Sequence, residues 1–125
     1  MYYKDILLID DDADDREIFE TALRRISAAA GFKAVASAID ALSILRAGHR
    51  PELIFLDLNM PLMNGMQFLK EIKKDTQLKD IPVIVFSTSG SFNSISQAKE
   101  LGARDYITKP YEIQQLVAIL EGFIQ

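Results

Sequence analysis

The chain has 125 residues, of which 49% are hydrophobic and 26% are charged, and its net charge at pH 7 is −4. This length fits one domain with its own core, and the hydrophobic content excludes a disordered chain. The acidic charge argues against a nucleic-acid partner, and the absence of cysteine excludes disulfides and cysteine-ligated zinc. Because no apolar run reaches the ~20 residues of a membrane span, and the N-terminus does not resemble a signal peptide, we expect a cytoplasmic protein with no membrane contact.

Short apolar runs alternate with segments of helical periodicity along the whole chain. The first run, residues 6–9, precedes a helical pattern that we expect to end near Gly31. Ile18, Ala22, Ile26 and Ala29 form one apolar stripe on that helix, and Phe19 and Leu23 flank it. The other strands are predicted over residues 33–37, 53–58, 83–86 and 104–108, and the other helices over residues 38–47, 65–75, 92–101 and 112–123.

Five strands that alternate with five helices predict an α/β fold with a parallel sheet and helices on both faces. The expected architecture is doubly wound and flavodoxin-like, (βα)5, with strand order 2-1-3-4-5 and its switch point between strands 1 and 3. No linker, repeat or low-complexity tract divides the sequence. Residues 1–125 are therefore expected to form a single domain.

The run at residues 53–58 is apolar on both faces, which is typical of a strand buried between two helical layers. It ends on one ionisable residue, Asp57, and the chain then turns through Pro61 and Asn64-Gly65. The pattern predicts a carboxylate at the carboxyl end of a central parallel strand. Ligands bind at that edge in open α/β sheets.

Polar side chains follow the other strands at the same edge: Asp10 and Asp11 after strand 1, Ser87 after strand 4 and Lys109 after strand 5. Close carboxylates repel by roughly 4 kcal/mol per pair at an effective dielectric of ~20, so the cluster needs protons, the lysine or a cation. Hard oxygen ligands without histidine or cysteine favour Mg²⁺. A carboxylate beside Mg²⁺ and a lysine can attack a phosphoryl donor and form an acyl phosphate.

Other polar residues have simpler interpretations. Asp12, Asp14 and Asp15 crowd the start of the first helix and are interpreted as cap and turn residues. Tyr106 lies inside the last strand, and from the residues alone it is either a core or an edge aromatic.

Four segments together resemble the receiver domain of two-component response regulators. Residues 57–65, Asp-Leu-Asn-Met-Pro-Leu-Met-Asn-Gly, resemble the family's D-x-x-M-P-x-M-[DN]-G stretch, and residues 9–12 resemble its first acidic motif. Residues 85–87 resemble its hydroxyl position, and residues 102–110, Gly-Ala-Arg-Asp-Tyr-Ile-Thr-Lys-Pro, resemble its G-A-x-x-Y-[IL]-x-K-P segment. The match covers nearly the whole chain.

The resemblance implies that Asp57 accepts a phosphoryl group from a sensor histidine kinase or a histidine phosphotransfer protein. It implies that Asp11, Asp57 and the backbone carbonyl of Asn59 bind Mg²⁺ directly, and that Asp10 binds it through water. Such a protein is a phosphoacceptor switch, not an enzyme with turnover, and at most it assists its own phosphorylation and dephosphorylation.

The resemblance also implies how the switch works. Ser87 and Lys109 would contact the phosphoryl oxygens, Tyr106 would be the switch aromatic, and the Lys109–Pro110 bond would be cis. A downstream protein or a second copy would dock on the fourth helix, fifth strand and fifth helix. Because the sequence ends after the fifth helix, we expect a stand-alone receiver of the chemotaxis type. Thr88 stands where the family often has Ala or Gly, which puts the dephosphorylation rate in question.

Three alternatives remain at this stage. A haloacid-dehalogenase-type phosphatase would use Asp10, but its D-x-D-x-[TV] motif is broken by Asp14 and its late acidic pair is replaced by Thr108-Lys109-Pro110. A flavin carrier of the same topology would need a Ser/Thr/Gly-rich phosphate loop where residues 10–15 are mostly acidic. A pseudo-receiver that only scaffolds is disfavoured by the complete set of acids, hydroxyl and lysine.

Overall fold

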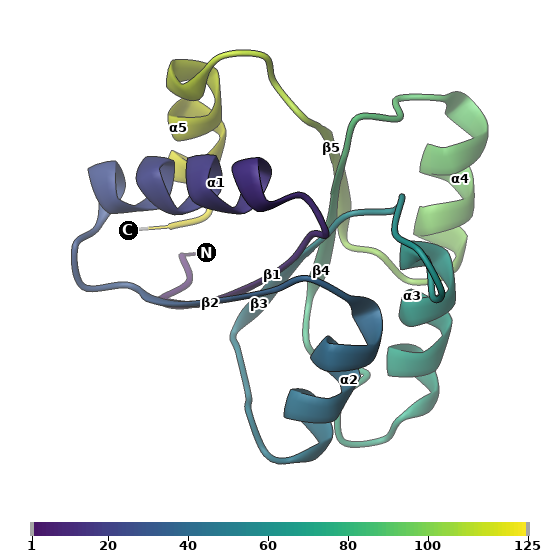
Figure 1. Ribbon diagram of the computed structural model, residues 1–125. Coiled ribbons are helices and arrows are strands. Elements are labelled where there is room, and N and C mark those ends of the chain that lie inside the picture. Colours follow the sequence, from purple (N-terminus) through teal and green to yellow (C-terminus); the bar gives the residue numbers. More distant parts are fainter. Residues whose placement is uncertain (1, 125) are drawn as a thin grey trace.

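The structure, a computed structural model, describes residues 2–124 and is shown in Figure 1. The strands are β1 (Asp5–Ile9), β2 (Gly31–Val35), β3 (Leu53–Leu56), β4 (Val83–Ser87) and β5 (Asp105–Thr108). The helices are α1 (Ala13–Ile26), α2 (Ala38–Arg46), α3 (Gly65–Lys74), α4 (Phe92–Glu100) and α5 (Ile113–Glu121). The strands form one parallel sheet in the order β2-β1-β3-β4-β5, which confirms the predicted fold class.

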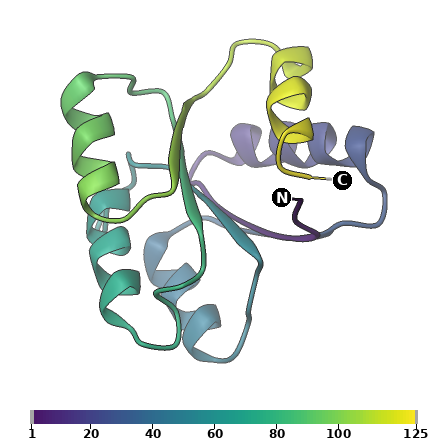
Figure 2. The ribbon, with the colours of Figure 1, turned by 180° about the vertical axis from the view of Figure 1, so that it is seen from behind.

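Helices cover both faces of the sheet, as Figures 1 and 2 show from opposite sides: α1 and α5 pack on one face, and α2, α3 and α4 on the other. Each face has its own core, and successive residues of a strand alternate between them. In β1, Leu7 and Ile9 join the core under α2–α4, whereas Ile6 and Leu8 join the core under α1 and α5. All four residues of β3 are buried, as the apolar run predicted.

An aromatic cluster fills the core under α1 and α5 near the carboxyl ends of the strands. The ring of Phe19 lies edge-on to Phe55 and Phe86, with centroids 5.1 and 5.7 Å apart. Such contacts add roughly 0.5–1.5 kcal/mol each beyond area burial. The Lys109 ammonium lies 5.8 Å from the centroid of the Phe86 ring. The aromatic cluster therefore packs directly beneath the Lys109 side chain.

The first helix is shorter than predicted and turned about its axis. It ends at Ile26 because Ser27 adopts an extended backbone, and Gly31 opens β2 instead of ending the helix. Ala29 therefore lies outside the helix, and Ile18 is 45% exposed. The buried face consists of Phe19, Ala22 and Leu23. The bulky Phe19 determines which of two neighbouring apolar stripes faces the sheet.

Two strand boundaries also differ from the prediction. β2 runs two residues earlier than residues 33–37, because Ser37 is the N-cap of α2 and its hydroxyl accepts a hydrogen bond from the backbone N–H of Asp40. β3 ends at Leu56, so Asp57 is the first residue of the loop that follows it. Among residues 2–124, every helix is too short or too polar to cross a bilayer.

Candidate functional site

Three of the predicted acids meet where β1 and β3 end side by side at the switch point of the sheet. The backbone N–H of Asp10 bonds to the carbonyl of Val35, and that of Asp57 bonds to the carbonyl of Ile9, so both acids continue the strand ladder. Asp10 and Asp57 are buried, whereas Asp11 is exposed. One carboxylate oxygen from each of the three lies within 4.8 Å of the others. This all-oxygen donor set fits a hard divalent cation such as Mg²⁺.

The loop after β3 holds Asp57 by a close backbone approach. A Cβ on Gly65 would lie 2.5 Å from the carbonyl oxygen of Asp57, so only glycine fits there. The N–H of Gly65 bonds to the carbonyl of Leu58 at 3.0 Å, which folds α3 back against the end of β3. Asn64 caps α3 through a reciprocal pair of bonds with Gln67. The Asn64-Gly65 turn in the sequence is therefore the start of α3.

Lys109 brings its positive charge into the acidic cluster from the loop after β5. Its ammonium lies 2.7 Å from Oδ2 of Asp10, 2.8 Å from Oδ2 of Asp15 and 3.9 Å from Oδ2 of Asp57. Its backbone N–H bonds to the carbonyl of Ser87, which fixes the loop to the end of β4. The side chain of Lys109 is only 10% exposed. The lysine therefore neutralises several carboxylates at once.

Asp15 belongs to this cluster, although the sequence predicted only a cap or turn role for it. The N-cap of α1 is Asp12, whose carboxylate accepts hydrogen bonds from the backbone N–H groups of Asp14 and Asp15. The side chain of Asp15 is thereby left to pair with Lys109. The sequence carries no spacing signal for this pairing, because Asp11 lies before the N-cap Asp12 and helical periodicity begins only at Ala13.

Burial sets the protonation behaviour of the site. Desolvation raises the pKa of Asp57 from 3.8 to about 6, against the lowering effect of the Lys109 charge and together with the raising effect of Asp10. Desolvation also raises the pKa of Asp10, although Lys109 partly offsets this. Burial lowers the pKa of Lys109, but its hydrogen bonds to Asp10 and Asp15 outweigh that effect, so the net shift is upward. Lys109 is therefore the charged partner of this cluster near neutrality.

Ser87, at the end of β4, is fully buried, and its Oγ has no hydrogen-bond partner among the described residues. The hydroxyl is near enough to lower the pKa of Asp57 slightly, yet it makes no bond of normal geometry. A buried hydroxyl without a partner costs about 1–3 kcal/mol. An acceptor group arriving at Asp57 would satisfy it.

Two other predicted site residues, Tyr106 in β5 and Asn59 in the loop after β3, lie beside the acidic cluster. The Tyr106 ring is half-buried against the core under α2–α4, its hydroxyl donates to the carbonyl of Ser89, and burial raises its pKa. The backbone N–H of Asn59 is near enough to lower the pKa of the Asp57 carboxyl, while the role of the Asn59 carbonyl as a metal ligand stays a prediction.

The prediction of a cis Lys109–Pro110 bond is wrong. No peptide bond between residues 2 and 124 is cis, so the Lys109–Pro110 bond is trans. The trans form is the intrinsically favoured one before proline, by about 0.5–1 kcal/mol.

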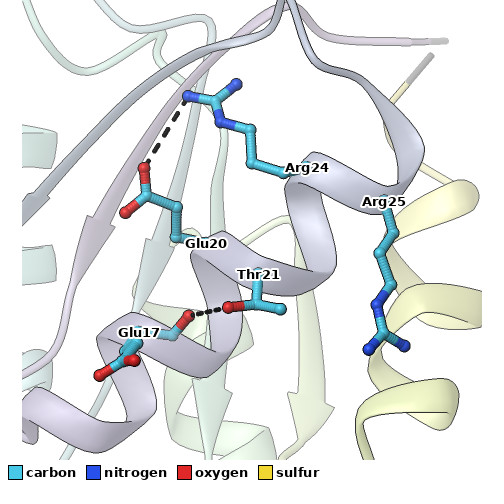
Figure 3. A pocket seen from close by; sticks show the side chains of 5 residues that line it. All are labelled: Glu17, Glu20, Thr21, Arg24 and Arg25. Carbon is cyan, nitrogen blue, oxygen red and sulfur yellow. Dashed lines mark hydrogen bonds and ion pairs between the residues drawn. The ribbon is translucent and has the colours of Figure 1, made fainter.

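Several hollows lie along α1, and one of them adjoins the cluster. Thr88 is exposed and lines this pocket beside Lys109, together with Asp15 and Phe86. A second hollow, shown in Figure 3, is lined by residues farther along α1. There Arg24 and Glu20 form an ion pair at 3.9 Å, and the hydroxyl of Thr21 donates to the carbonyl of Glu17. These contacts are internal to the helix, so the second hollow adds nothing to the acidic cluster.

Residues 6–121 match the family described as the response regulator receiver domain. The chain is 33% identical to the phosphate regulon transcriptional regulatory protein PhoB of Pseudomonas aeruginosa, over all of this chain and 53% of that protein. It is 32% identical to the chemotaxis protein CheY1 of Helicobacter pylori, over 93% of each. The chain thus spans about half the length of the first transcriptional regulators that it matches and nearly all of CheY1.

Solved structures with the same fold show the same likeness. The phosphorylated cyanobacterial phytochrome response regulator RcpA has a TM-score of 0.88 and 36% identity, over 96% of this chain and 90% of that one. The Mn²⁺-bound response regulator Rcp1 has a TM-score of 0.83 and 30% identity, over 94% and 88%. At these identities, the likeness extends from the fold to the sequence.

Proposed function

This chain belongs to the response regulator receiver domain family, and from that premise we propose that it is a phosphoryl-accepting switch with Asp57 as the phosphoacceptor. One observation carries the proposal. The carboxylate of Asp57 directly follows the central strand β3, beside Asp10 and Asp11 and 3.9 Å from the ammonium of Lys109. This arrangement supports a carboxylate nucleophile with a cation site and a lysine charge beside it.

The donor in this proposal is a phosphohistidine on a sensor histidine kinase or a histidine phosphotransfer protein. An Asp57 carboxylate oxygen attacks the phosphorus, the P–N bond breaks, and its electron pair stays on the imidazole, which leaves an acyl phosphate on Asp57. A pKa of about 6 keeps Asp57 mostly ionised at neutral pH, as a nucleophile requires. Catalysis of such transfers is mostly positioning and charge neutralisation. This chemistry makes the protein a stoichiometric acceptor and not an enzyme with turnover.

The carboxylate oxygens of Asp10, Asp11 and Asp57 fit Mg²⁺ by number, hardness and proximity. We assign direct contacts to Asp11, Asp57 and the carbonyl of Asn59, and a water-mediated contact to Asp10. These residues would hold the ion, and its positive charge would offset the negative charge that develops during phosphoryl transfer. The similar response regulator Rcp1 has a Mn²⁺-bound form, which supports divalent-ion binding by this chain.

The switch uses Ser87, Lys109 and Tyr106. A phosphoryl group adds about 1.5–2 negative charges and offers acceptors to the unpartnered Ser87 hydroxyl and to the Lys109 ammonium. Movement of Ser87 changes the space beside Tyr106, whose bond to Ser89 ties β5 to the loop before α4. A shift from 1:99 to 99:1 needs about 5.5 kcal/mol, which several charge-assisted contacts can supply.

The output of the switch is docking at the surface of α4, β5 and α5. Phe92, the first residue of α4, is 81% exposed, and Tyr111, after β5, is fully exposed. These aromatic side chains offer contact area to a downstream protein or to a second copy of the chain. In this proposal residues 1–125 act as one receiver domain in the cytoplasm.

Incubation with acetyl phosphate and Mg²⁺, followed by mass spectrometry, tests the phosphoacceptor. The protein should gain one phosphoryl group on Asp57, Asp57→Asn should gain none, and Asp14→Asn, an exposed charge-matched control, should gain it normally. A label on Asp10 would contradict the proposal and favour the phosphatase alternative. Phosphotransfer from candidate histidine kinases, with the same variants, then identifies the donor.

A further inference from the structure

We propose that Asp15 is a positioning residue of this site, whose carboxylate holds the Lys109 ammonium in a resting position and competes for it with a phosphoryl group on Asp57. The inference rests on the proposed function of Asp57. It concerns a side chain that the proposed phosphoryl transfer does not otherwise use.

The Lys109 ammonium lies closer to Asp10 and Asp15 than to Asp57. It hydrogen-bonds to Asp15 at 2.8 Å and to Asp10 at 2.7 Å, but its distance to Asp57 is 3.9 Å, beyond a normal hydrogen bond. Asp10 is a fixed partner, since its other oxygen accepts the backbone N–H of Asp12 at 3.0 Å and its side chain is 1% exposed. Asp15, at 35% exposure, is the partner that lies toward solvent.

The backbone of Asp15 is held in the first turn of α1, so a change in the Asp15–Lys109 distance would come from movement of the lysine side chain. Asp15 is the third residue of α1, its backbone N–H bonds to the N-cap carboxylate of Asp12, and the helix is packed on the sheet through Phe19 and Leu23. Lys109 reaches the cluster on a flexible four-carbon side chain. Of all the hydrogen bonds among residues 2–124, the only one made by the Asp15 carboxylate is the bond to Lys109.

A phosphoryl group on Asp57 needs the Lys109 ammonium at its oxygens. Drawing the ammonium there weakens or breaks its bond to Asp15, so that bond favours the resting arrangement over the phosphorylated one. Asp15 therefore sets how tightly the site retains a phosphoryl group. Since a partly exposed ion pair contributes little, the effect on affinity should be about two- to five-fold.

Beryllofluoride, a phosphoryl mimic, tests the competition in saturating Mg²⁺, with binding followed by ¹⁹F NMR titration. Asp15→Asn should bind it about two- to five-fold more tightly than the unaltered protein. Asp14→Asn, which loses the same charge from the same helical turn but has an exposed side chain, should bind it unchanged. Asp15→Glu keeps the charge and should restore the original affinity.

The ammonium signal of Lys109 in ¹⁵N NMR gives a readout that needs no phosphoryl mimic. Its hydrogen exchange with water should quicken in Asp15→Asn, but not in Asp14→Asn or Asp15→Glu. Equal effects of Asp15→Asn and Asp14→Asn on binding would overturn the inference in favour of bulk charge, and unchanged or weaker binding by Asp15→Asn would also overturn it. If the unaltered protein bound no beryllofluoride at Asp57, the proposed function would fall as well. If the unaltered protein binds beryllofluoride but substitution of Asp15 has no effect, only the inference about Asp15 is wrong and the proposed function stands.

Discussion

The ammonium of Lys109 lies 2.7 Å from Oδ2 of Asp10 and 3.9 Å from Oδ2 of Asp57, so the more deeply buried acid is the one that the lysine neutralises directly. The Asp57 carboxylate makes no hydrogen bond to the Lys109 ammonium, and burial raises its pKa. The resting site is thus organised around the Asp10–Lys109 pair.

Replacement of Lys109 by Met should destabilise the fold by about 3 kcal/mol, because it leaves Asp10 buried without its cation. Urea denaturation of the metal-free protein measures this. Adding Asp10→Asn to Lys109→Met should recover most of the loss, since no buried charge remains to be paired. A loss below about 1 kcal/mol, with no recovery in the double variant, would show that the ion pair has little effect on stability.

Asp57→Asn should stabilise the metal-free protein at about pH 7 by roughly 2–3 kcal/mol. Folding raises the pKa of Asp57 from 3.8 to about 6, so the folded state binds this proton more tightly than the unfolded state does. The destabilisation by the buried charge is present above about pH 6 and fades as pH falls toward the unfolded value near 3.8. Urea denaturation against pH should therefore show the gap between the two proteins closing below about pH 4. A stability difference that does not change with pH would contradict the raised pKa of Asp57.

On the proposed function, Mg²⁺ should raise the melting temperature of the protein, because it would bind the folded cluster and not the unfolded chain. At about a hundred times its Kd, the expected gain is about 2.7 kcal/mol. Asp11→Asn removes an exposed carboxylate of the cluster without disturbing the core, and it should blunt this response. Asp14→Asn should retain it, and calorimetry with increasing Mg²⁺ compares the three. An unchanged response in Asp11→Asn would remove that residue from the metal site.

Tyr106→Phe should lower stability by about 1 kcal/mol, because it deletes the hydrogen bond to the Ser89 carbonyl while keeping the packed ring. Amide exchange in the loop before α4 should quicken in parallel. Tyr111→Phe is the matched control: that side chain is fully exposed, and its loss of a hydroxyl should be neutral. Equal results for the two variants would mean that the Tyr106 bond does not hold this loop.

Leu62→Asn should stabilise the protein by up to about 1 kcal/mol, because asparagine tolerates the left-handed backbone better than leucine does. Leu62 has a φ of 69° and is 90% exposed, so the change loses no burial. Leu62→Ala keeps the strain and should give no comparable gain in urea denaturation. A gain as large with alanine would assign the effect to the exposed leucyl side chain instead of the backbone.

The sequence alone predicted the sheet and the edge at which the polar groups meet. Because all the strands run parallel, their carboxyl ends lie at one edge of the sheet, so Asp10, Asp57, Ser87 and Lys109 could be grouped from their positions after apolar runs. Helix ends were less predictable, as α1 shows. Two apolar stripes of similar strength compete there, and the packing of Phe19 against Phe55 and Phe86 decides between them.

The sequence determined that Asp10, Asp57 and Lys109 share the site, and only the tertiary structure added Asp15 and decided how these charges pair. Asp15 and Lys109 are 94 positions apart, and their bond depends on where α1 begins and how the loop after β5 turns. No periodicity encodes that contact, because hydrogen-bond energy changes over fractions of an ångström while sequence patterns fix position only to a face or an edge. The same is true of the trans Lys109–Pro110 bond and of the unpartnered hydroxyl of Ser87.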